Sequence, residues 1–256
     1  MSPHSSLRSL TIPDAGWVLS LCPSAGEAGG SFVSSYRPRS AWVPGMPVKD
    51  PERSRLEAAR RARGRVRRYC AANRLNRMGT LTYAGSGVRD PAQVRRDVGV
   101  FFRDLRDELG GEPFPYLWVP EWHKTDHGLH LHFGVGHFVR QRLIEQTWGR
   151  GFVSIKRLSN LPVGSTSLHE ARRVAGYLSK YVSKSFDAGQ RERPRGLHRF
   201  DVAQGFQPRT VRFRGVSVDG VLGSAVEVMG EHPSQMWSSD VVEGWRGPPA
   251  VWFAWD

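Results

Sequence analysis

The feature that most constrains the fold is a pair of apolar stretches that lie close together in the chain. Residues 116–123 and 129–135 are both rich in residues that favour β-strands. Between them, residues 124–128 include Thr, Asp and Gly, which are typical of turns. Two strands joined by so short a connection form a hairpin. We therefore predict antiparallel strand pairing at the centre of the chain.

Strand and helix signals continue on both sides of this hairpin. An aspartate followed by proline, at 50–51 and again at 90–91, is typical of a helix start, and Ser167 with Glu170 has the form of a capping box. Together with the apolar periodicity, these signals predict further strands at 77–83, 151–158 and 211–218 and helices at about 50–73, 91–109, 138–148, 167–185 and 219–229.

The two ends of the chain differ in composition from the middle. Residues 1–49 are rich in Ser, Gly and Pro without a sustained period, so we expect a flexible N-terminal arm. Residues 50–218 form the expected central domain, which includes the basic first helix. Residues 219–256 are expected to hold a C-terminal helix and a tryptophan-rich tail. We assign these tryptophans to packing rather than to base stacking.

The net charge indicates a polyanionic partner. The chain has 37 Lys and Arg against 24 Asp and Glu, which gives a formal charge of +13. A field of this sign attracts nucleic acid, whereas a membrane is the weaker alternative because no apolar stretch is long enough to span a bilayer. The only cysteines, Cys22 and Cys70, fit a reduced, cytoplasmic protein and exclude a zinc site of paired cysteines.

Arginines are concentrated in the first predicted helix. Between Asp50 and Arg77 there are ten arginines against three acidic residues. A solvated helix face is one interpretation, and a surface that follows DNA phosphates is the other. We favour the second interpretation and expect DNA contacts at Arg60, Arg61, Arg63, Arg65, Arg67 and Arg68.

The second strand of the hairpin contains the sequence His130-Leu131-His132. Alternate residues of a strand project from the same face, so the two imidazoles can converge on one ion. If the turn is centred near residues 126 and 127, Glu121 lies opposite His132 and His123 lies opposite His130. We predict Glu121 as the third ligand, because a carboxylate suits Mg²⁺ or Mn²⁺, with His123 as the alternative. A histidine pair without a metal role is the other interpretation, and zinc would lack a closed set of four ligands.

The predicted helix at 167–185 carries two tyrosines four residues apart. Tyr177 and Tyr181 share one helix face with Lys180 and Lys184, while apolar residues gather on a different side. Burial of both tyrosines in the core is the alternative, but two phenols and two ammonium groups on one buried face would need many polar partners. A lysine favours the phenolate, and a metal on the phosphate oxygens offsets developing charge. These residues suggest metal-assisted attack of a tyrosine on a DNA phosphate.

Three motifs resemble those of HUH-family (histidine–hydrophobic–histidine) rolling-circle replication initiators, the Rep proteins of plasmids and phages of high-GC Gram-positive bacteria. Thr80-Leu81-Thr82 is similar to the first motif of the family, His130-Leu131-His132 to its metal motif, and the segment from Tyr177 to Tyr181 to the two-tyrosine form of its catalytic motif. The three motifs occur in the order of the family, and the resemblance covers about residues 78–184.

The resemblance implies an α+β fold of the HUH endonuclease, RRM-like kind, with a central antiparallel sheet of about five strands and helices packed on one face. It implies that residues 50–218 form an endonuclease domain that nicks and rejoins single-stranded or hairpin origin DNA through a 5′-phosphotyrosine intermediate. Mg²⁺ or Mn²⁺ is the implied cofactor, and a host helicase and the replication machinery are the implied partners.

Several alternatives remain open at the level of sequence. Tyr177 is the better candidate if one tyrosine acts alone, since single-tyrosine initiators keep a similar Tyr-x-x-Lys sequence. A two-tyrosine single-strand DNA transposase would share the chemistry but not the biological role. A non-catalytic basic protein that binds DNA through its arginine-rich helix is the alternative from another functional class. The sequence makes no prediction of an oligomeric state.

Overall fold

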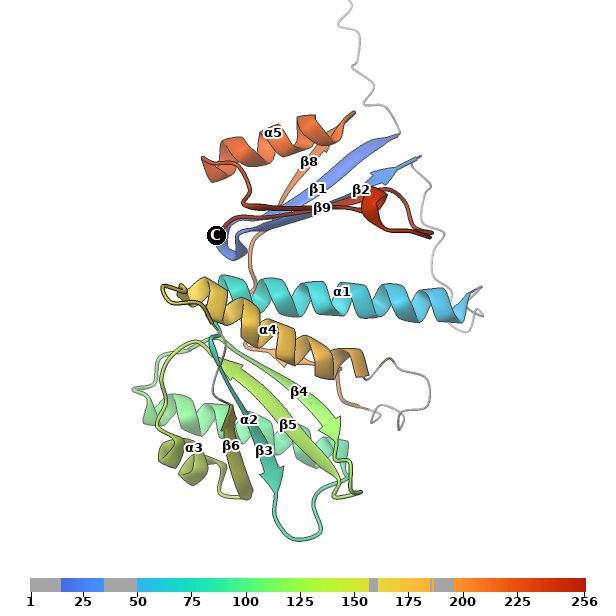
Figure 1. Ribbon diagram of the computed structural model, residues 1–256. Helices are drawn as coiled ribbons and strands as arrows, with labels where there is room; N and C mark the ends of the chain where they lie inside the picture. Colours follow the sequence, from blue (N-terminus) through green and yellow to red (C-terminus); the bar gives the residue numbers. More distant parts are fainter. Residues whose placement is uncertain (1–14, 35–49, 157–160, 185, 187–195) are drawn as a thin grey trace, which may run out of the picture. The chain divides into compact units, whose positions relative to one another are not determined.

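A computed structural model describes residues 15–34, 50–156, 161–184, 186 and 196–256 of the chain. These residues contain five α-helices and two antiparallel sheets of five strands each (Figure 1), so the predicted α+β class is confirmed. The chain divides into two compact units, each with one of the sheets. In the described part of the chain, no helix combines the length and the apolar character needed to cross a bilayer.

The larger unit is built on a sheet with the strand order β6-β3-β5-β4-β7. All neighbouring pairs are antiparallel, and the pairing of β4 with β5 confirms the predicted hairpin. The central strand β5 is buried along its whole length. The bounds of the strands are β3 (Arg77–Tyr83), β4 (Tyr116–Trp122), β5 (Leu129–Val135), β6 (Gly151–Lys156) and β7 (Asp201–Val202).

Helices cover both faces of this sheet, and not one face as the resemblance implies. The helices α2 (Pro91–Glu108) and α3 (Gln141–Trp148) pack on the face from which alternate β5 residues such as Leu131 project. On the opposite face, α4 (Ser167–Lys184) lies over the sheet and packs against α1 (Pro51–Ala72), as Figure 1 shows. The physical reason is that α4 has its own apolar stripe, which the second face of the sheet covers.

A glycine in β5 allows α4 to lie close to the sheet. A Cβ atom at Gly134 would be 3.1 Å from Leu178 Cδ1 and 3.6 Å from Val174 Cγ1. Both of these α4 residues are fully buried against the sheet. The contact fixes the distance between α4 and β5, and therefore also the positions of the polar residues that α4 carries.

The smaller unit contains a sheet with the strand order β8-β1-β2-β10-β9. The helix α5 (Val218–Met229) packs on this sheet, where Leu19, Leu21, Val221 and Phe253 belong to one buried core. The remaining elements are β1 (Gly16–Cys22), the 3-10 turn Pro23–Ala25, β2 (Glu27–Val33), β8 (Val211–Gly215), β9 (Gln235–Ser238), the 3-10 turn Ser239–Val241 and β10 (Ala250–Ala254).

This second sheet corrects the expected organisation of the chain ends. The prediction of a flexible arm is wrong for residues 16–33, which form β1 and β2, while residues 1–14 and 35–49 of the expected arm lie outside the described residues. The strand β8, which the sequence places in the central domain, pairs with β1. The tryptophan-rich tail supplies β9 and β10, and the burial of Trp255 agrees with a packing role.

Close approach of backbones explains why the first two strands are hard to recognise. A Cβ atom at Gly30 in β2 would lie 2.6 Å from the Val18 carbonyl oxygen of β1. The position therefore requires glycine, although glycine is depleted in strands. The partners of β1 and β2 also come from the other end of the chain, at a distance that local sequence patterns do not reveal.

Candidate metal and tyrosine site

Three side chains of the β4–β5 hairpin meet on the face of the sheet that α4 covers. Glu121 Oε2 lies 3.0 Å from His130 Nε2 and 2.8 Å from His132 Nε2, and the two imidazole nitrogens are 3.0 Å apart. Ligand atoms at right angles around an ion at about 2.1 Å are separated by about 3.0 Å. The three donors thus have the spacing of one face of an octahedral ligand set, and can hold a metal ion.

The register of the hairpin differs from the predicted one by two residues. Glu121 pairs with His130 and not with His132. The turn is centred one residue earlier than predicted, because Asp126 (φ 47°) and Gly128 (φ 83°) take left-handed conformations that close it there. Side chains alternate with a period of two, so a shift of two residues leaves each of them on its predicted face. Glu121 consequently still reaches both histidines.

His123, the alternative third ligand, lies beside the three donors and is not part of the group. Its ring centroid is 5.3 Å from that of His130. Its Nδ1 atom lies 2.7 Å from Thr125 Oγ1 and accepts a hydrogen bond from the Thr125 N–H at 3.2 Å. These contacts hold the ring toward the turn, whereas Glu121 occupies the third position beside the histidines.

Two neighbouring side chains orient the donors. Thr80 Oγ1 lies 3.0 Å from His132 Nδ1, and Lys184 Nζ donates to Glu121 Oε1 at 2.6 Å. When His132 Nδ1 carries the proton and donates to Thr80, its Nε2 atom has the lone pair that binds a metal. Thr80 belongs to the first motif of the resemblance, whose role the sequence does not indicate, and the geometry makes it an orienting residue for His132.

The surroundings keep two of the donors in the protonation state that cation binding requires. Burial raises the pKa of Glu121, but hydrogen bonds with His130, His132 and Lys184 outweigh this effect and hold the pKa well below its usual range. Burial lowers the pKa of His132, and the hydrogen bond with Glu121 opposes this shift only in part. Glu121 is therefore ionised and His132 neutral near pH 7, as in metal-binding side chains.

The helix α4 brings both predicted tyrosines to this face of the sheet. The Tyr181 ring stacks on the His132 ring, with centroids 3.5 Å apart and an interplanar angle of 10°. Tyr177 lies one turn earlier, with Lys156 Nζ 4.1 Å from its ring centroid. Burial raises the pKa of Tyr181, and the charge of Glu121 adds to this rise. Both rings are only half-buried and have polar neighbours, unlike the apolar core of the alternative interpretation.

The two predicted lysines of α4 have different surroundings. Lys184 is half-buried, with its Nζ atom 5.1 Å from the centroid of the Tyr181 ring, whereas Lys180 is exposed. Both line a cavity of about 680 Å³ that also borders Glu121 and Lys124. Three ammonium groups around one cavity suit the binding of a phosphate group.

Lys156 is a site residue that the sequence does not indicate. It lies at the end of β6, far from the tyrosines in sequence, and no motif includes it. Its position on the Tyr177 ring arises because β6 pairs with β3 at the edge of the sheet beside α4. Only the tertiary structure brings this cation to the tyrosine.

The arginines predicted to contact DNA lie on α1. The side chain of Arg63 comes within 3.4 Å of Ser183 Oγ on α4. Arg61 and Arg65 line a polar groove of about 630 Å³ together with residues 198–202. Among the six predicted residues, Arg60, Arg61, Arg63 and Arg65 are exposed, and Arg67 and Arg68 are half-buried. A basic helix thus lies against the helix that carries both tyrosines, and its contact with DNA stays a prediction.

Comparison with protein families places this site in context. Residues 76–186, somewhat less than half of the chain, match the family model of the ORF2-type replication-associated proteins. The chain contains a Rep-type domain. The matched segment runs from the start of β3 to just beyond α4, so the three donors and both tyrosines of the Rep-type domain lie within it.

The family assignment supports a role in the initiation of replication and contact with DNA. It does not distinguish between one-tyrosine and two-tyrosine types. Comparisons with curated proteins and with solved structures gave no match.

Proposed function

We propose that the Rep-type domain nicks and rejoins single-stranded or hairpin origin DNA through a 5′-phosphotyrosine intermediate, and so starts rolling-circle replication. The observation that carries this proposal is the convergence of Glu121, His130 and His132 within 2.8–3.0 Å, beside a helix with two tyrosines. The proposed setting is the cytoplasm, where a host helicase and the replication machinery would extend the freed strand.

The donor set fits a hard divalent cation. One buried carboxylate and two imidazoles at octahedral spacing suit Mg²⁺ or Mn²⁺, and Glu121, His130 and His132 would hold it. A bound ion of this kind supplies positive charge to the oxygens of the phosphate that is attacked. Thr80 and Lys184 keep the donors oriented, and the stacked ring of Tyr181 covers one side of His132.

The chemical step is a transesterification that conserves the energy of the cleaved bond. The phenolic oxygen of Tyr177 bonds to phosphorus and the bond from phosphorus to the 3′ oxygen breaks. The phenolic proton is lost to solvent and the leaving 3′ oxygen gains one. Attack by a 3′-OH on the phosphotyrosine reverses the step and rejoins a strand. Tyr181, one helical turn further, provides a second nucleophile while Tyr177 is still joined to DNA.

Cations of the domain have separate roles in this proposal. Lys156 lies on the Tyr177 ring and Lys184 near the Tyr181 ring, where each favours the phenolate form of its tyrosine. The exposed Lys180 binds a phosphate in the cavity beside Glu121. The arginines of α1 bind the flanking phosphates of the strand.

A covalent-adduct assay tests the proposal. The full chain is incubated with Mn²⁺ and a pool of random-sequence single-stranded DNA, and adducts that survive denaturation are separated by electrophoresis. We expect an adduct with the unmodified chain, none with the double variant Tyr177→Phe/Tyr181→Phe, and about a 100-fold loss with His132→Ala. An adduct that persists in the double variant would exclude attack by these tyrosines. DNA binding without any adduct would support the non-catalytic alternative.

A further inference from the structure

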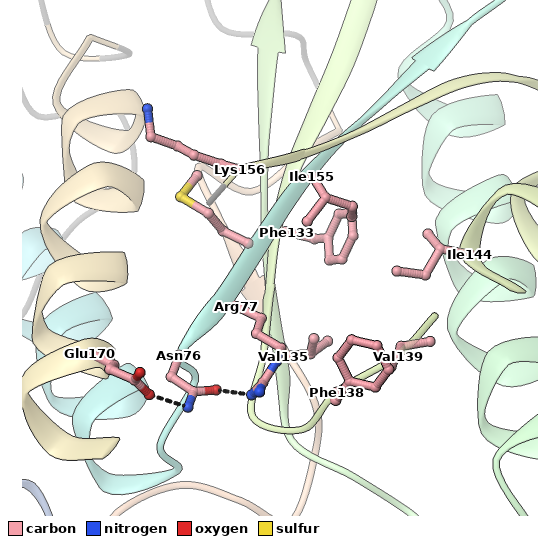
Figure 2. A pocket seen from close by; sticks show the side chains of 11 residues that line it. Asn76, Arg77, Phe133, Val135, Phe138, Val139, Ile144, Ile155, Lys156 and Glu170 are labelled. Atoms are coloured by element: carbon pink, nitrogen blue, oxygen red, sulfur yellow. Dashed lines mark hydrogen bonds between the residues drawn. The ribbon is translucent and has the colours of Figure 1, made fainter. Parts of the chain in front are cut away.

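A second cavity lies between the sheet and the flanking helices of the Rep-type domain. It has a volume of about 380 Å³ and is bordered by the ends of β3, β5 and β6, by α4 and by the segment that leads into α3 (Figure 2). Its floor is apolar and consists of Met78, Phe133, Val135, Val139, Ile144 and Ile155. A pocket of this size with an apolar floor and few polar groups is typical of a small, flat organic ligand.

The polar groups of this pocket form a short row at its edge. Asn76 Nδ2 donates to Glu170 Oε2 at 2.6 Å, and Arg77 Nη1 donates to Asn76 Oδ1 at 2.8 Å (Figure 2). The two contacts fix the plane of the amide and use one donor and one acceptor position, while an amide has two of each. The row can therefore offer directional hydrogen bonds to the edge of a planar ligand.

An exposed aromatic ring stands at the mouth of the same pocket. Phe138 is 69 % exposed, and the Arg77 guanidinium lies 5.8 Å from the centroid of its ring. Proteins recognise unpaired nucleobases by stacking them on aromatic rings or guanidinium planes and by hydrogen bonds to their edges. Phe138, Arg77 and Asn76 provide these elements together.

The pocket is connected to the predicted nucleophile by a single side chain. Lys156 lines the pocket and its Nζ atom lies 4.1 Å from the centroid of the Tyr177 ring (Figure 2 shows the lysine extending toward α4). A ligand in the pocket is thus a near neighbour of the group that Tyr177 attacks. The Glu170 carboxylate at the edge disfavours an isolated anion, so the ligand must offer an uncharged, planar part to the pocket.

We propose that this pocket binds one unstacked base of the DNA strand that Tyr177 cleaves. The inference rests on the proposed nicking function and adds a specificity subsite to it. The base stacks on Phe138 over the apolar floor, its edge bonds to Asn76, and Lys156 contacts the phosphate next to it. Recognition of this base would select the nucleotide sequence near the nick and would place the strand on Tyr177.

The nick sequence selected by variants is the main test. Adducts captured from the random pool are sequenced for the unmodified chain, for Phe138→Ala and Asn76→Ala, and for Phe152→Ala. Phe152 is a matched control because it is 70 % exposed on β6 but does not line the pocket. We expect one position of the motif to lose its base preference in Phe138→Ala and Asn76→Ala, and all positions to be kept in Phe152→Ala. An unchanged motif in both pocket variants overturns the proposal and leaves the nicking function standing.

A binding measurement separates the two ideas if no adduct forms at all. Without metal, the affinity of the full chain for short oligo(dA), oligo(dC) and oligo(dT) is compared with that for an abasic strand of equal length and charge. Loss of one stacked base reduces binding by about fivefold or more. We expect Phe138→Ala to lower the preference for base-bearing strands by this factor and Phe152→Ala to leave it unchanged. Equal effects of both variants, or tighter binding of an apolar peptide than of any oligonucleotide, would exclude a base pocket.

Discussion

At the residue scale, each donor of the site depends on a neighbour from another strand or helix. Alternation along β5 is sufficient to predict that His130 and His132 share a face, and the same rule places Glu121 opposite them. The exact pairing was not predictable, because it depends on the left-handed conformation of Asp126 in the turn. The partner of His132 was also hidden, since Thr80 reaches it only through the pairing of β3 with β5.

The orienting role of Thr80 is testable with an isosteric change. We expect Thr80→Val to lower the affinity for Mn²⁺ by about tenfold, because the His132 ring loses the partner that fixes its orientation. Thr82→Val is the matched control, since Thr82 lies on the same face of β3 and is also half-buried. Titration calorimetry of the metal-free protein measures both affinities. Equal losses in the two variants would mean that Thr80 has only a packing role.

A buried tyrosine outside the site gives a pH-dependent prediction. The Tyr83 hydroxyl donates to Asp97 Oδ2 at 3.0 Å, and burial, followed by the charge of Asp97, raises the pKa of Tyr83 above its usual value. Below about pH 10 the folded and unfolded chains both keep this proton. Above that pH the unfolded phenol ionises first, so the free energy of unfolding falls as the pH rises.

The variant Tyr83→Phe isolates this effect. Near pH 7 we expect it to unfold with a free energy lower by about 1 kcal/mol, because the hydrogen bond is lost. Since the variant has no phenol at this position, the difference should shrink as the pH rises from about 10 to 11. Urea denaturation at several pH values measures it, and a difference that stays constant over this range would contradict the pKa shift. The other tyrosines cancel in the comparison.

At the element scale, α4 connects the metal donors to the nucleophiles. Its apolar stripe and its polar face could be predicted from the helical period, but its start is one residue earlier than the capping box suggests. Thr166 and His169 form the reciprocal side-chain contacts at the start of the helix. Glu170 is consequently free of the capping role and bonds to Asn76. Local sequence rules identify the helix, whereas competition among neighbouring polar residues decides which of them caps it.

The position of α4 on the sheet can be changed without altering the donors. A larger side chain at Gly134 would push against Leu178 and move both tyrosines relative to the histidines. We expect Gly134→Val to keep its affinity for Mn²⁺ but to form adducts about tenfold more slowly or worse, with Gly134→Ala in between. Rates of adduct formation and Mn²⁺ titrations measure the two effects. A rate that is unchanged in the valine variant would show that the approach of α4 to β5 does not control the chemistry.

At the scale of the whole molecule, composition predicted the kind of partner better than the organisation of the chain. The charge of +13 agrees with the DNA-binding role of the Rep-type family. The second sheet was not foreseen, because β1 and β2 pair with strands from the C-terminal end and contain glycines at close backbone contacts. Long-range pairing of short strands leaves little trace in local sequence, whereas a helix or a hairpin can be recognised from its own residues.

The basic surface of α1 gives a prediction about salt dependence. Each lost contact with a phosphate of single-stranded DNA reduces the slope of log affinity against log salt concentration by about 0.7. We therefore expect the double variant Arg61→Ala/Arg65→Ala to bind all sequences more weakly and to reduce the slope by about 1.4. Arg103→Ala/Arg142→Ala is the control, because α2 and α3 pack on the face of the sheet away from the histidines. Fluorescence anisotropy at several salt concentrations measures the slopes, and equal slopes in both double variants would refute a DNA-binding role of α1.

The central claim is that a tyrosine of α4 becomes joined to the 5′ phosphate of DNA, and peptide mapping of the adduct tests it most directly. Trypsin cleaves after Arg173, Lys180 and Lys184, so residues 174–180 and 181–184 separate the two tyrosines into different peptides. After nuclease digestion, we predict a nucleotide mass on the peptide that contains Tyr177, and on the peptide that contains Tyr181 when a second cut is allowed. A nucleotide on any other peptide, or DNA bearing a free 5′ phosphate and no modified tyrosine, would contradict the account.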